Sequence, residues 1–470
     1  MKMNGLLMDC SRLLERHEYY HRLIDFMADW KMNTLLLNLT DDHGCALQLP
    51  GFRHLAMPNA FSTSEIGELI AHAGERAIEI IPLLQVFGHT RYLTDHPKHA
   101  HLFAGRKTRK IVFNAVDPLN PETTRIMRRL IGAVARLFPS RFLHLGCDEV
   151  DMAAFCKSRG LNEAAVWADY VNLMIGYAKD QGKAPLIWGD HPADNEEIAA
   201  RLRKDVILVE WRYYENPRED AIRRLKKTGF KDIVAAPSLA CYLHRFLPTE
   251  GALKNTRRMA RFAAKYELMG VINTIWCPWR YVQKTLYYGI AYSARVVAGG
   301  GKIRVKEFRR EFARKVFGTR LTDTLNRFLT AWPKLAVPYP VCEKFSQKRP
   351  VFDRKQRERL KEVNRLGERV LGLAGKYQPA KNRDIWNAMV LAARAVWLLS
   401  ESCMLQAERA PAPERRTAYN RLLREVRNDL SAEWDQGRFA DDPRKFRPVF
   451  PNEADQHMLF LLNRLRRIRS

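Results

Sequence analysis

The sequence predicts an α/β fold: a (β/α)8 barrel over residues 1–318, followed by a basic, all-α C-terminal domain over residues 319–470. Two observations carry this prediction. Eight short apolar runs alternate with amphipathic stretches over roughly the first 300 residues, and such runs are lacking after about residue 320. A third observation argues against an open dinucleotide-binding sheet, because no glycine-rich turn follows the first run.

The eight apolar runs are short, continuous and rich in Leu, Ile or Val, as expected for strands that are buried on both faces of a parallel sheet. They cover residues 5–9, 33–40, 77–84, 141–147, 184–190, 205–211, 230–238 and 270–276. Helical patterns lie between them and complete the alternation, at 17–30, 64–76, 121–138, 161–182, 217–229, 251–268 and 283–298. Ser64-Glu65 and Asn120-Pro121 are typical of helix starts.

The C-terminal third has helical periodicity interrupted by prolines, and it predicts a domain of four to six helices. The helical segments are 321–335, 354–375, 381–409, 413–433 and 455–468. Many of their residues are Arg and Glu. We interpret their basic faces as solvated helix surfaces rather than as a binding stripe.

The composition and the net charge limit the kinds of partner that the protein is expected to bind. The chain has 79 basic and 52 acidic side chains, a net charge of +27, and 46% apolar residues. The basic residues are spread along the whole chain without a nucleic-acid motif, so we expect no specific nucleic-acid binding, while an anionic glycan remains a candidate partner.

The expected compartment is the cytoplasm. The eight cysteines lie far apart and form no CxxC motif, which suggests a reducing environment. Residues 1–9 carry no secretory signature and run directly into the first strand. No stretch approaches the roughly 18 consecutive apolar residues that a membrane span needs, so no membrane association is expected.

Chemistry in a barrel is expected at the carboxyl ends of the strands. One adjacent pair of carboxylates, Asp148 and Glu149, follows the fourth apolar run, and Trp188, Trp211 and Trp276 end three other runs. An Asp-Glu dipeptide alone is more often a helix cap or an ion-pair partner. Paired acids among aromatic rings at strand ends instead suggest sugar chemistry, because a protonated carboxyl can donate to a glycosidic oxygen while rings pack on sugar C–H faces.

The adjacency of the two acids narrows the mechanism. Neighbouring side chains on a strand point to opposite faces, so both reach one pocket only where the strand has ended. Glycosidases with two catalytic carboxylates usually hold them about 5–10 Å apart on different strands. An adjacent pair suits a substrate that supplies its own nucleophile. Asp148 would then orient a 2-acetamido group and Glu149 would act as acid and base.

The motif H-L-G-C-D-E-V at 144–150 resembles the signature of the family 20 β-N-acetylhexosaminidases. Further matching stretches lie at 6–12, 31–42, 64–73 and 81–89, and the likeness is greatest to the hexosaminidase D-like branch, which lacks the family's usual N-terminal domain. The resemblance covers roughly residues 1–300. It implies a retaining exo-enzyme that removes terminal β-linked GalNAc or GlcNAc through an oxazolinium intermediate, with no cofactor and no metal.

The resemblance also implies a role for each matching residue. Asp148 matches the aspartate that orients the acetamido group, and Glu149 matches the general acid/base. Substrate-binding positions are implied for His89 near the reaction centre, Trp188 and Trp211 in the acetamido wall, Tyr242 as a donor to the acetamido oxygen, and Trp276 under the sugar ring.

Four positions depart from the family pattern. Asn4 replaces an arginine and Asn38 a histidine, while His244 replaces an aspartate and Pro278 a glutamate. In the resemblance these positions serve the outer sugar hydroxyls, so recognition of O3, O4 and O6 is expected to be rebuilt, and GalNAc is at least as well supported as GlcNAc. Replacement contacts are expected from Asp42 as a substrate-binding residue, and from Asp41, His191 and Arg280.

Three alternatives stay open. His99-Ala100-His101 has the H-x-H spacing of metal-dependent hydrolases on the same fold. A glycan-binding protein without catalysis would retain the same pocket, and the basic helical tail could bind nucleic acid. The expected partner is a glycan with a terminal N-acetylhexosamine, and a homodimer is left open.

Overall fold

The computed structural model describes residues 2–105, 115–241, 246–337, 341, 344, 351–407, 412–438, 458 and 465. The chain forms two compact units. The barrel unit comprises Met1–Ser238, Asn255–Ile275 and Val296–Gly301, and the helical unit comprises Leu239–Lys254, Trp276–Arg295 and Lys302–Ser470. This division differs from the expected boundary at residue 318, because segments on both sides of the last barrel strand group with the C-terminal helices.

The barrel consists of eight parallel strands, each of which overlaps one of the eight apolar runs, so the predicted fold class is confirmed. The strands are β1 (Met3–Asp9), β2 (Thr34–Asn38), β6 (Glu79–Leu83), β7 (Phe142–His144), β8 (Ala184–Trp188), β9 (Ile207–Trp211), β10 (Ile233–Ala236) and β12 (Gly270–Ile275). They pair in this order, and β12 pairs with β1 to close the barrel. Nearly all strand residues are buried, which explains their continuous apolar character.

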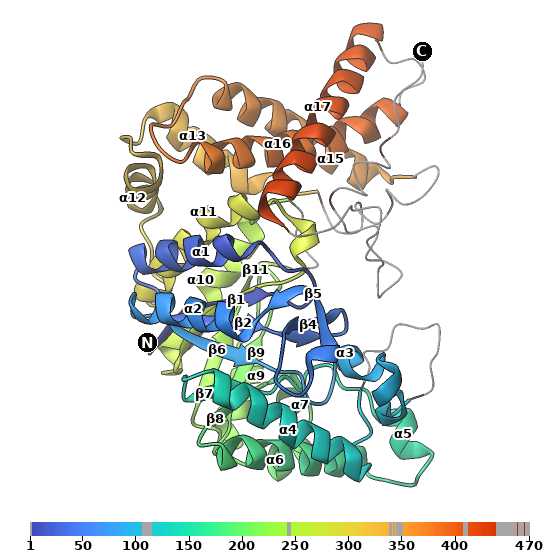
Figure 1. Cartoon of the computed structure of the whole chain (residues 1–470). Coiled ribbons are helices and arrows are strands. Elements are labelled where there is room, and N and C mark those ends of the chain that lie inside the picture. Colours follow the sequence, from blue (N-terminus) through green and yellow to red (C-terminus); the bar gives the residue numbers. More distant parts are fainter. Residues whose placement is uncertain are drawn as a thin grey trace. The chain divides into compact units, whose positions relative to one another are not determined.

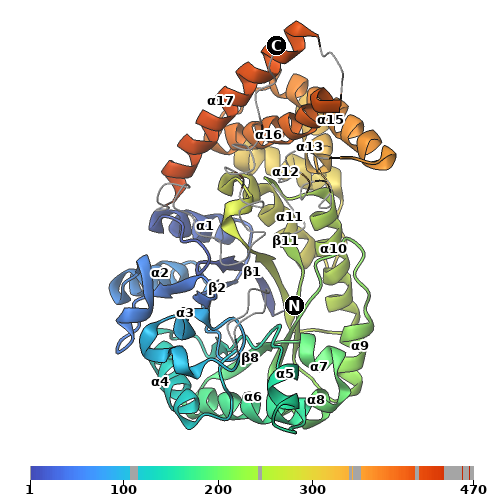
Figure 2. The same cartoon turned by 90° about the vertical axis from the view of Figure 1, so that its right-hand side faces the viewer.

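Helices surround the strands within the barrel unit, as Figure 2 shows for α2, α4, α6, α8 and α9. They include α1 (His17–Asp29), α2 (Thr63–Gly74), α4 (Pro121–Leu137), α6 (Glu163–Asp180), α8 (Glu196–Arg201) and α9 (Asp220–Lys227). Asn120 caps α4 with Pro121 at the first helical position, as predicted. The start of α2 lies earlier than predicted: Ser62 is the cap, and it forms a capping box with Glu65.

A small sheet follows β2 and was not predicted. It consists of β3 (Thr40–Asp41), β4 (Gly44–Leu47) and β5 (Ala56–Phe61), with β3 and β4 antiparallel. The sheet begins two residues after the carboxyl end of β2. It therefore fixes Asp41 and Asp42 at the end of the barrel where catalytic groups are expected.

The helical unit contains α12 (Val305–Phe317), α13 (Asp323–Ala331), α15 (Arg354–Ala374), α16 (Arg383–Ala407) and α17 (Pro413–Gly437). Helix α15 packs on α16 and α16 packs on α17 (Figure 1). These helices confirm the predicted segments from 321 to 433, whereas 455–468 lies almost wholly outside the described residues.

One described helix, at Arg383–Leu405 in α16, is long and apolar enough to cross a membrane by length and composition. No such segment was expected from the sequence, because charged and polar residues interrupt its apolar run. Of its apolar window, 78% is buried inside the protein, where α16 is the central helix between α15 and α17.

Among the described residues seven cysteines are free thiols, and only Cys277 of these is not fully buried.

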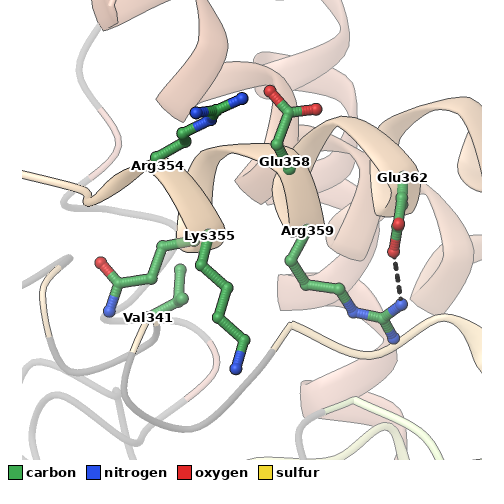
Figure 3. Close-up of a pocket in the computed structure, with 7 residues that line it drawn as sticks. Val341, Arg354, Lys355, Glu358, Arg359 and Glu362 are labelled. Atoms are coloured by element: carbon green, nitrogen blue, oxygen red, sulfur yellow. Dashed lines mark hydrogen bonds and ion pairs between the residues drawn. The ribbon is translucent and has the colours of Figure 1, made fainter.

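The basic face of α15 is interleaved with acids. A hollow of about 700 Å³ there is lined by Val341, Arg354, Lys355, Gln356, Glu358, Arg359 and Glu362 (Figure 3). Arg359 pairs with Glu362 at 2.9 Å and Lys361 with Glu358 at 2.9 Å. Such pairs one helical turn apart are typical of a solvated helix surface, which fits the interpretation made from the sequence.

Candidate active site

The turn after β7 brings the two adjacent acids to one place. The strand ends at His144, and Gly146, Cys147 and Glu149 then adopt positive φ values of 69°, 71° and 51°. Left-handed backbone is uncommon at residues that carry a side chain and is often found at functional sites. Here it lets both carboxylates face one imidazole: Nε2 of His89 lies 3.5 Å from Oδ2 of Asp148 and 3.3 Å from Oε2 of Glu149.

His89 is the centre of a cluster of carboxylates. Its side chain is almost fully buried, and Nδ1 lies 3.1 Å from Oδ2 of Asp42 and 3.4 Å from Oδ1 of Asp41. Burial alone would lower the pKa of His89, but the charges of Asp148 and Asp41 outweigh it and raise this pKa well above its ordinary value. The surrounding carboxylates therefore favour the imidazolium form of His89.

Asp148 is held in its ionised form. Burial favours the neutral acid, but the charge of His89 and a hydrogen bond from Gln85 lower the pKa of Asp148 overall. Nε2 of Gln85 donates to Oδ1 of Asp148 at 3.0 Å, and Oε1 of Gln85 accepts from the backbone N–H of Cys147 at 3.3 Å. The Asp148 side chain is 14% exposed and the Glu149 side chain 39%, so Glu149 is the more accessible acid.

A second layer of charges holds Asp41. Nη2 of Arg12 lies 3.0 Å from Oδ1 of Asp41, while Nη1 pairs with Asp9 at 3.1 Å. The amide of Asn38 donates to Asp41 at 3.2 Å and to Asp9 at 3.1 Å. Burial would raise the pKa of Asp41, but Arg12 and then His89 outweigh it and lower this pKa. Asn38 thus belongs to the support of the carboxylate cluster.

The chain after β8 holds the turn from the other side. Oδ2 of Asp190 accepts from the backbone N–H of Glu149 at 3.0 Å, and Nε2 of His191 accepts from that of Val150 at 2.9 Å. Burial, reinforced by the charge of Asp148, raises the pKa of Asp190 to about 6. The ring of His191 packs against Trp167, with centroids 5.0 Å apart.

Asp42 and His191, which were expected to contact the substrate, contact protein groups in this structure. Both oxygens of Asp42 have protein donors: Oδ2 faces His89, and Oδ1 accepts from the backbone N–H of Arg91 at 3.2 Å. Because its side chain is fully buried, Asp42 positions His89 rather than facing open space. His191 is likewise occupied with the backbone of Val150. The expectation that these two residues contact outer sugar hydroxyls is therefore corrected.

Asn4 lies near the amino end of β1, at the opposite end of the barrel from the acids. It lines a hollow of about 880 Å³ whose other members include Lys2, Asn33, Asp232 and Glu267. Its backbone N–H donates to the side chain of Asn33 at 2.9 Å. The replacement at this position therefore does not remove a contact beside Asp148 and Glu149 in this structure.

The predicted aromatic residues are only partly described. Trp188 is 1% exposed, and its ring packs on His144 with centroids 4.6 Å apart. Trp211 is half-buried and lies 5.1 Å from the ring of Tyr213. Trp276 follows β12 directly and is half-buried in the helical unit. Tyr242 and His244 lie outside the described residues.

Pro278 and Arg280 belong to the helical unit. They begin and end a short 3-10 helix, and the carbonyl of Pro278 accepts a hydrogen bond from Nη2 of Arg438 at 2.7 Å. Arg280 is buried there, with 6% exposure. The structure therefore unites Asp148, Glu149, His89 and Asp42, while it assigns Pro278 and Arg280 to packing within the other unit.

Sequence reasoning missed Gln85, Asp190 and Arg12 as members of the site. Each had a detectable signal. Gln85 lies within the run that leads to Gly88-His89, Asp190 follows the end of β8 by two residues, and Arg12 follows β1 by three residues. A search for polar residues within a few positions of every strand end would have found all three.

The H-x-H pair does not form one metal site. Nε2 of His101 lies 2.9 Å from Glu122, whereas Nε2 of His99 faces His54 at 3.0 Å. Donor atoms of Asp41, Asp42 and His89, and of His89, Asp148 and Glu149, do lie within 4.8 Å of one another. In the described structure these atoms belong to the carboxylate cluster around His89, in which Arg12 pairs with Asp41.

Gly88 permits the loop after β6 to lie close to the turn after β7 that carries Asp148 and Glu149. A Cβ atom there would lie 2.5 Å from the carbonyl oxygen of Asp148 and 3.0 Å from Cγ2 of Val150. We expect Gly88→Ala to lower the free energy of unfolding by about 1–3 kcal/mol, because the backbone must move, and to reduce turnover. Gly67→Ala on α2 is the control: nothing lies within 4 Å of its Cβ, so a gain of about 0.5–1 kcal/mol is expected. Urea unfolding measures both, and similar values for the two variants would contradict the close approach.

Glu210 makes stability depend on pH. It is fully buried on β9, and burial raises its pKa to about 8 although Nη2 of Arg212 lies 3.0 Å away. A carboxyl whose pKa is higher in the folded state binds more protons when folded, so stability falls as the pH rises from about 4.5 to 8. We expect the wild type to lose about 2–4 kcal/mol over this range relative to Glu210→Gln. The exposed Glu196→Gln is the control, and parallel stability curves for wild type and Glu210→Gln would contradict the assignment.

The comparisons with known proteins agree with the barrel. The model of the glycosyl hydrolase family 20 catalytic domain matches residues 2–290. A β-hexosaminidase of Vibrio furnissii is 25% identical over 64% of this chain and 56% of its own length. Hexosaminidase D of Bos taurus is 27% identical over 48% of this chain and 70% of its own length. A β-N-acetylhexosaminidase of Bacteroides fragilis shares the fold, with a TM-score of 0.53 at 18% identity over 67% of this chain and 69% of that one.

The protein is therefore a glycoside hydrolase with a (β/α)8 barrel. More particularly, the match over most of the barrel shows that the chain belongs to glycosyl hydrolase family 20, as its motifs predicted. The chain spans about half the length of the Vibrio furnissii and Akkermansia muciniphila relatives.

Proposed function

We propose that the protein is a retaining exo-β-N-acetylhexosaminidase that removes terminal β-linked GalNAc or GlcNAc by substrate-assisted catalysis. The observation that carries this proposal is the unequal state of two adjacent acids at one site. Asp148 is largely buried and held ionised by His89 and Gln85, while Glu149 is open to an incoming group. Family membership and the relatives named β-hexosaminidase support it.

The first step forms an oxazolinium ion. The Asp148 carboxylate accepts the N–H of the 2-acetamido group and turns its carbonyl oxygen onto C1. That oxygen forms a bond to C1 as the glycosidic C1–O bond breaks, and Glu149 donates its proton to the leaving oxygen. In the second step Glu149 takes a proton from water, whose oxygen attacks C1 and reopens the ring. The two displacements at C1 give net retention.

His89 makes the different roles of the acids compatible. Two neighbouring carboxylates repel each other, and one of them would otherwise be favoured in its protonated form. The His89 imidazolium between them, supported by Asp41 and Asp42, stabilises the charge on Asp148 throughout the cycle. Glu149 is then free to lose and regain its proton while Asp148 stays ionised.

A panel of nitrophenyl β-glycosides tests the activity. It contains the GalNAc, GlcNAc, galactose and glucose derivatives, and a sulfated GlcNAc derivative, because a protein of net charge +27 favours anionic glycans. We expect at least one acetamido sugar to be cleaved about a thousandfold faster than its 2-hydroxy counterpart. Comparable rates for both kinds of sugar would overturn the proposal. Binding of the acetamido sugars without turnover would favour the glycan-binding alternative.

A further inference from the structure

Three histidines form a cluster that takes no part in the site described above. His54 lies in the 3-10 helix Arg53–Leu55, His99 in the 3-10 helix Pro97–Leu102, and His96 directly precedes the latter. Nε2 of His54 and Nε2 of His99 are 3.0 Å apart, and the ring centroids of His54 and His96 are 4.7 Å apart. One nitrogen from each of the three rings lies within 4.8 Å of the other two.

These distances suit a small transition-metal ion. In a tetrahedral zinc site with Zn–N bonds of about 2.0–2.1 Å, two ligand nitrogens are about 3.3–3.4 Å apart. The contact between His54 and His99 is already close to this value. We propose that His54, His96 and His99 bind one Zn²⁺ ion, with the fourth position open to water.

The donor chemistry selects the kind of metal. Three imidazoles suit Zn²⁺, Cu²⁺ or Ni²⁺, whereas Ca²⁺ and Mg²⁺ require oxygen ligands. In the absence of metal, His54 and His99 share one proton between their facing nitrogens, because one must donate and the other accept. Zn²⁺ needs the lone pairs of both Nε2 atoms, so the imidazole that donates in the metal-free protein must change to its Nδ1–H tautomer when the ion binds.

The environment keeps the ligands available. His99 is 3% exposed, so the packing around it fixes the position of its ring beside His54. Its Nδ1 is buried without a hydrogen-bond partner among the described residues. Nδ1 of His96 accepts from the backbone N–H of Lys98 at 3.2 Å, an exposed bond that a metal ion can replace.

The ion would connect two loops that lead to the acid pair. His54 follows β4 in the small sheet whose first strand contains Asp41, and His96 and His99 follow His89 in the loop after β6. Binding at the three histidines therefore restrains two segments that carry residues of the carboxylate cluster. The site uses none of the proposed catalytic residues, and it stands independently of the proposed activity.

Titration of the metal-free full chain with Zn²⁺ tests the site, with a chromogenic chelator as competitor. We expect one equivalent to bind with a micromolar or tighter Kd. His54→Ala should weaken binding about 100-fold or more, and because His54 is exposed this variant should fold normally. The matched control is His101→Ala, which removes a nearby histidine that pairs with Glu122 and should bind as the wild type does.

Two further measurements separate this site from the acid pair. Co²⁺ should produce the visible absorption of a tetrahedral nitrogen site in the wild type and in Glu149→Gln, but not in His96→Ala. Zn²⁺ should raise the Tm of the wild type and of His101→Ala by several degrees, and leave that of His54→Ala unchanged. Binding of less than a tenth of an equivalent by the wild type, or equal affinity in His54→Ala, would overturn the proposal.

Discussion

Replacement of Glu149 by glutamine is expected to lower kcat/KM by about 10²–10⁴-fold on substrates with poor leaving groups, such as alkyl β-N-acetylhexosaminides. The amide cannot donate a proton to the glycosidic oxygen, so departure of a basic alkoxide becomes the limiting step. A dinitrophenolate leaves with little protonation, and its loss should be far smaller. Steady-state kinetics over a series of leaving groups measures the difference, which appears as a steeper dependence of rate on leaving-group pKa in the variant.

Asp151→Asn is the matched control for Glu149→Gln. Asp151 is exposed two residues further along the same turn, and its carboxylate accepts from the backbone N–H of Ala153 at 3.1 Å. We expect its leaving-group dependence to match the wild type. An equal loss across all leaving groups in Glu149→Gln would contradict the assignment of Glu149 as the general acid.

Replacement of Asp148 by asparagine should impair both classes of substrate, by about 10²–10³-fold. The acetamido group must be held with its oxygen against C1 before either kind of leaving group can depart. The asparagine side chain also removes the negative charge that His89 faces at 3.5 Å, so the pKa of His89 should fall. NMR titration of the His89 ring reports this change independently of activity.

Asp42→Asn separates orientation of the substrate from support of His89. Asp42 contacts His89 and the backbone of Arg91, and its side chain is fully buried. We therefore expect a smaller loss of kcat than for Asp148→Asn, with the same trend in the pKa of His89. For Asp148→Asn, the contradicting result is a loss of activity confined to substrates with poor leaving groups, because the general acid would then be Asp148 instead of Glu149.

The barrel could be predicted from sequence because its strands are buried on both faces, which gives continuous apolar runs separated by amphipathic helices. The β3–β5 sheet could not, because β3 has two residues and carries Asp41. The capping box of α2 was present as Ser62 and Glu65, but Ser64 offered a competing start.

The acid pair could be found because it directly follows the fourth strand signal. Its support could not, since contacts such as Gln85 with Asp148 join residues 63 positions apart. Asp42 has the residue type of a substrate contact, but only the structure shows that both its oxygens are occupied. His99 was paired with His101 by spacing, whereas its partner in space is His54, 45 residues earlier.

The most direct test of substrate assistance is to change the nucleophile on the substrate. Aryl β-N-acetylhexosaminides with zero to three fluorine atoms on the acetamido methyl group differ mainly in how readily the carbonyl oxygen attacks C1. If Asp148 directs this oxygen onto C1, kcat/KM must fall steadily with each fluorine, because the oxygen becomes less nucleophilic. A rate that stays constant from the acetamide to the trifluoroacetamide would contradict the account, since the nucleophile would then belong to the protein.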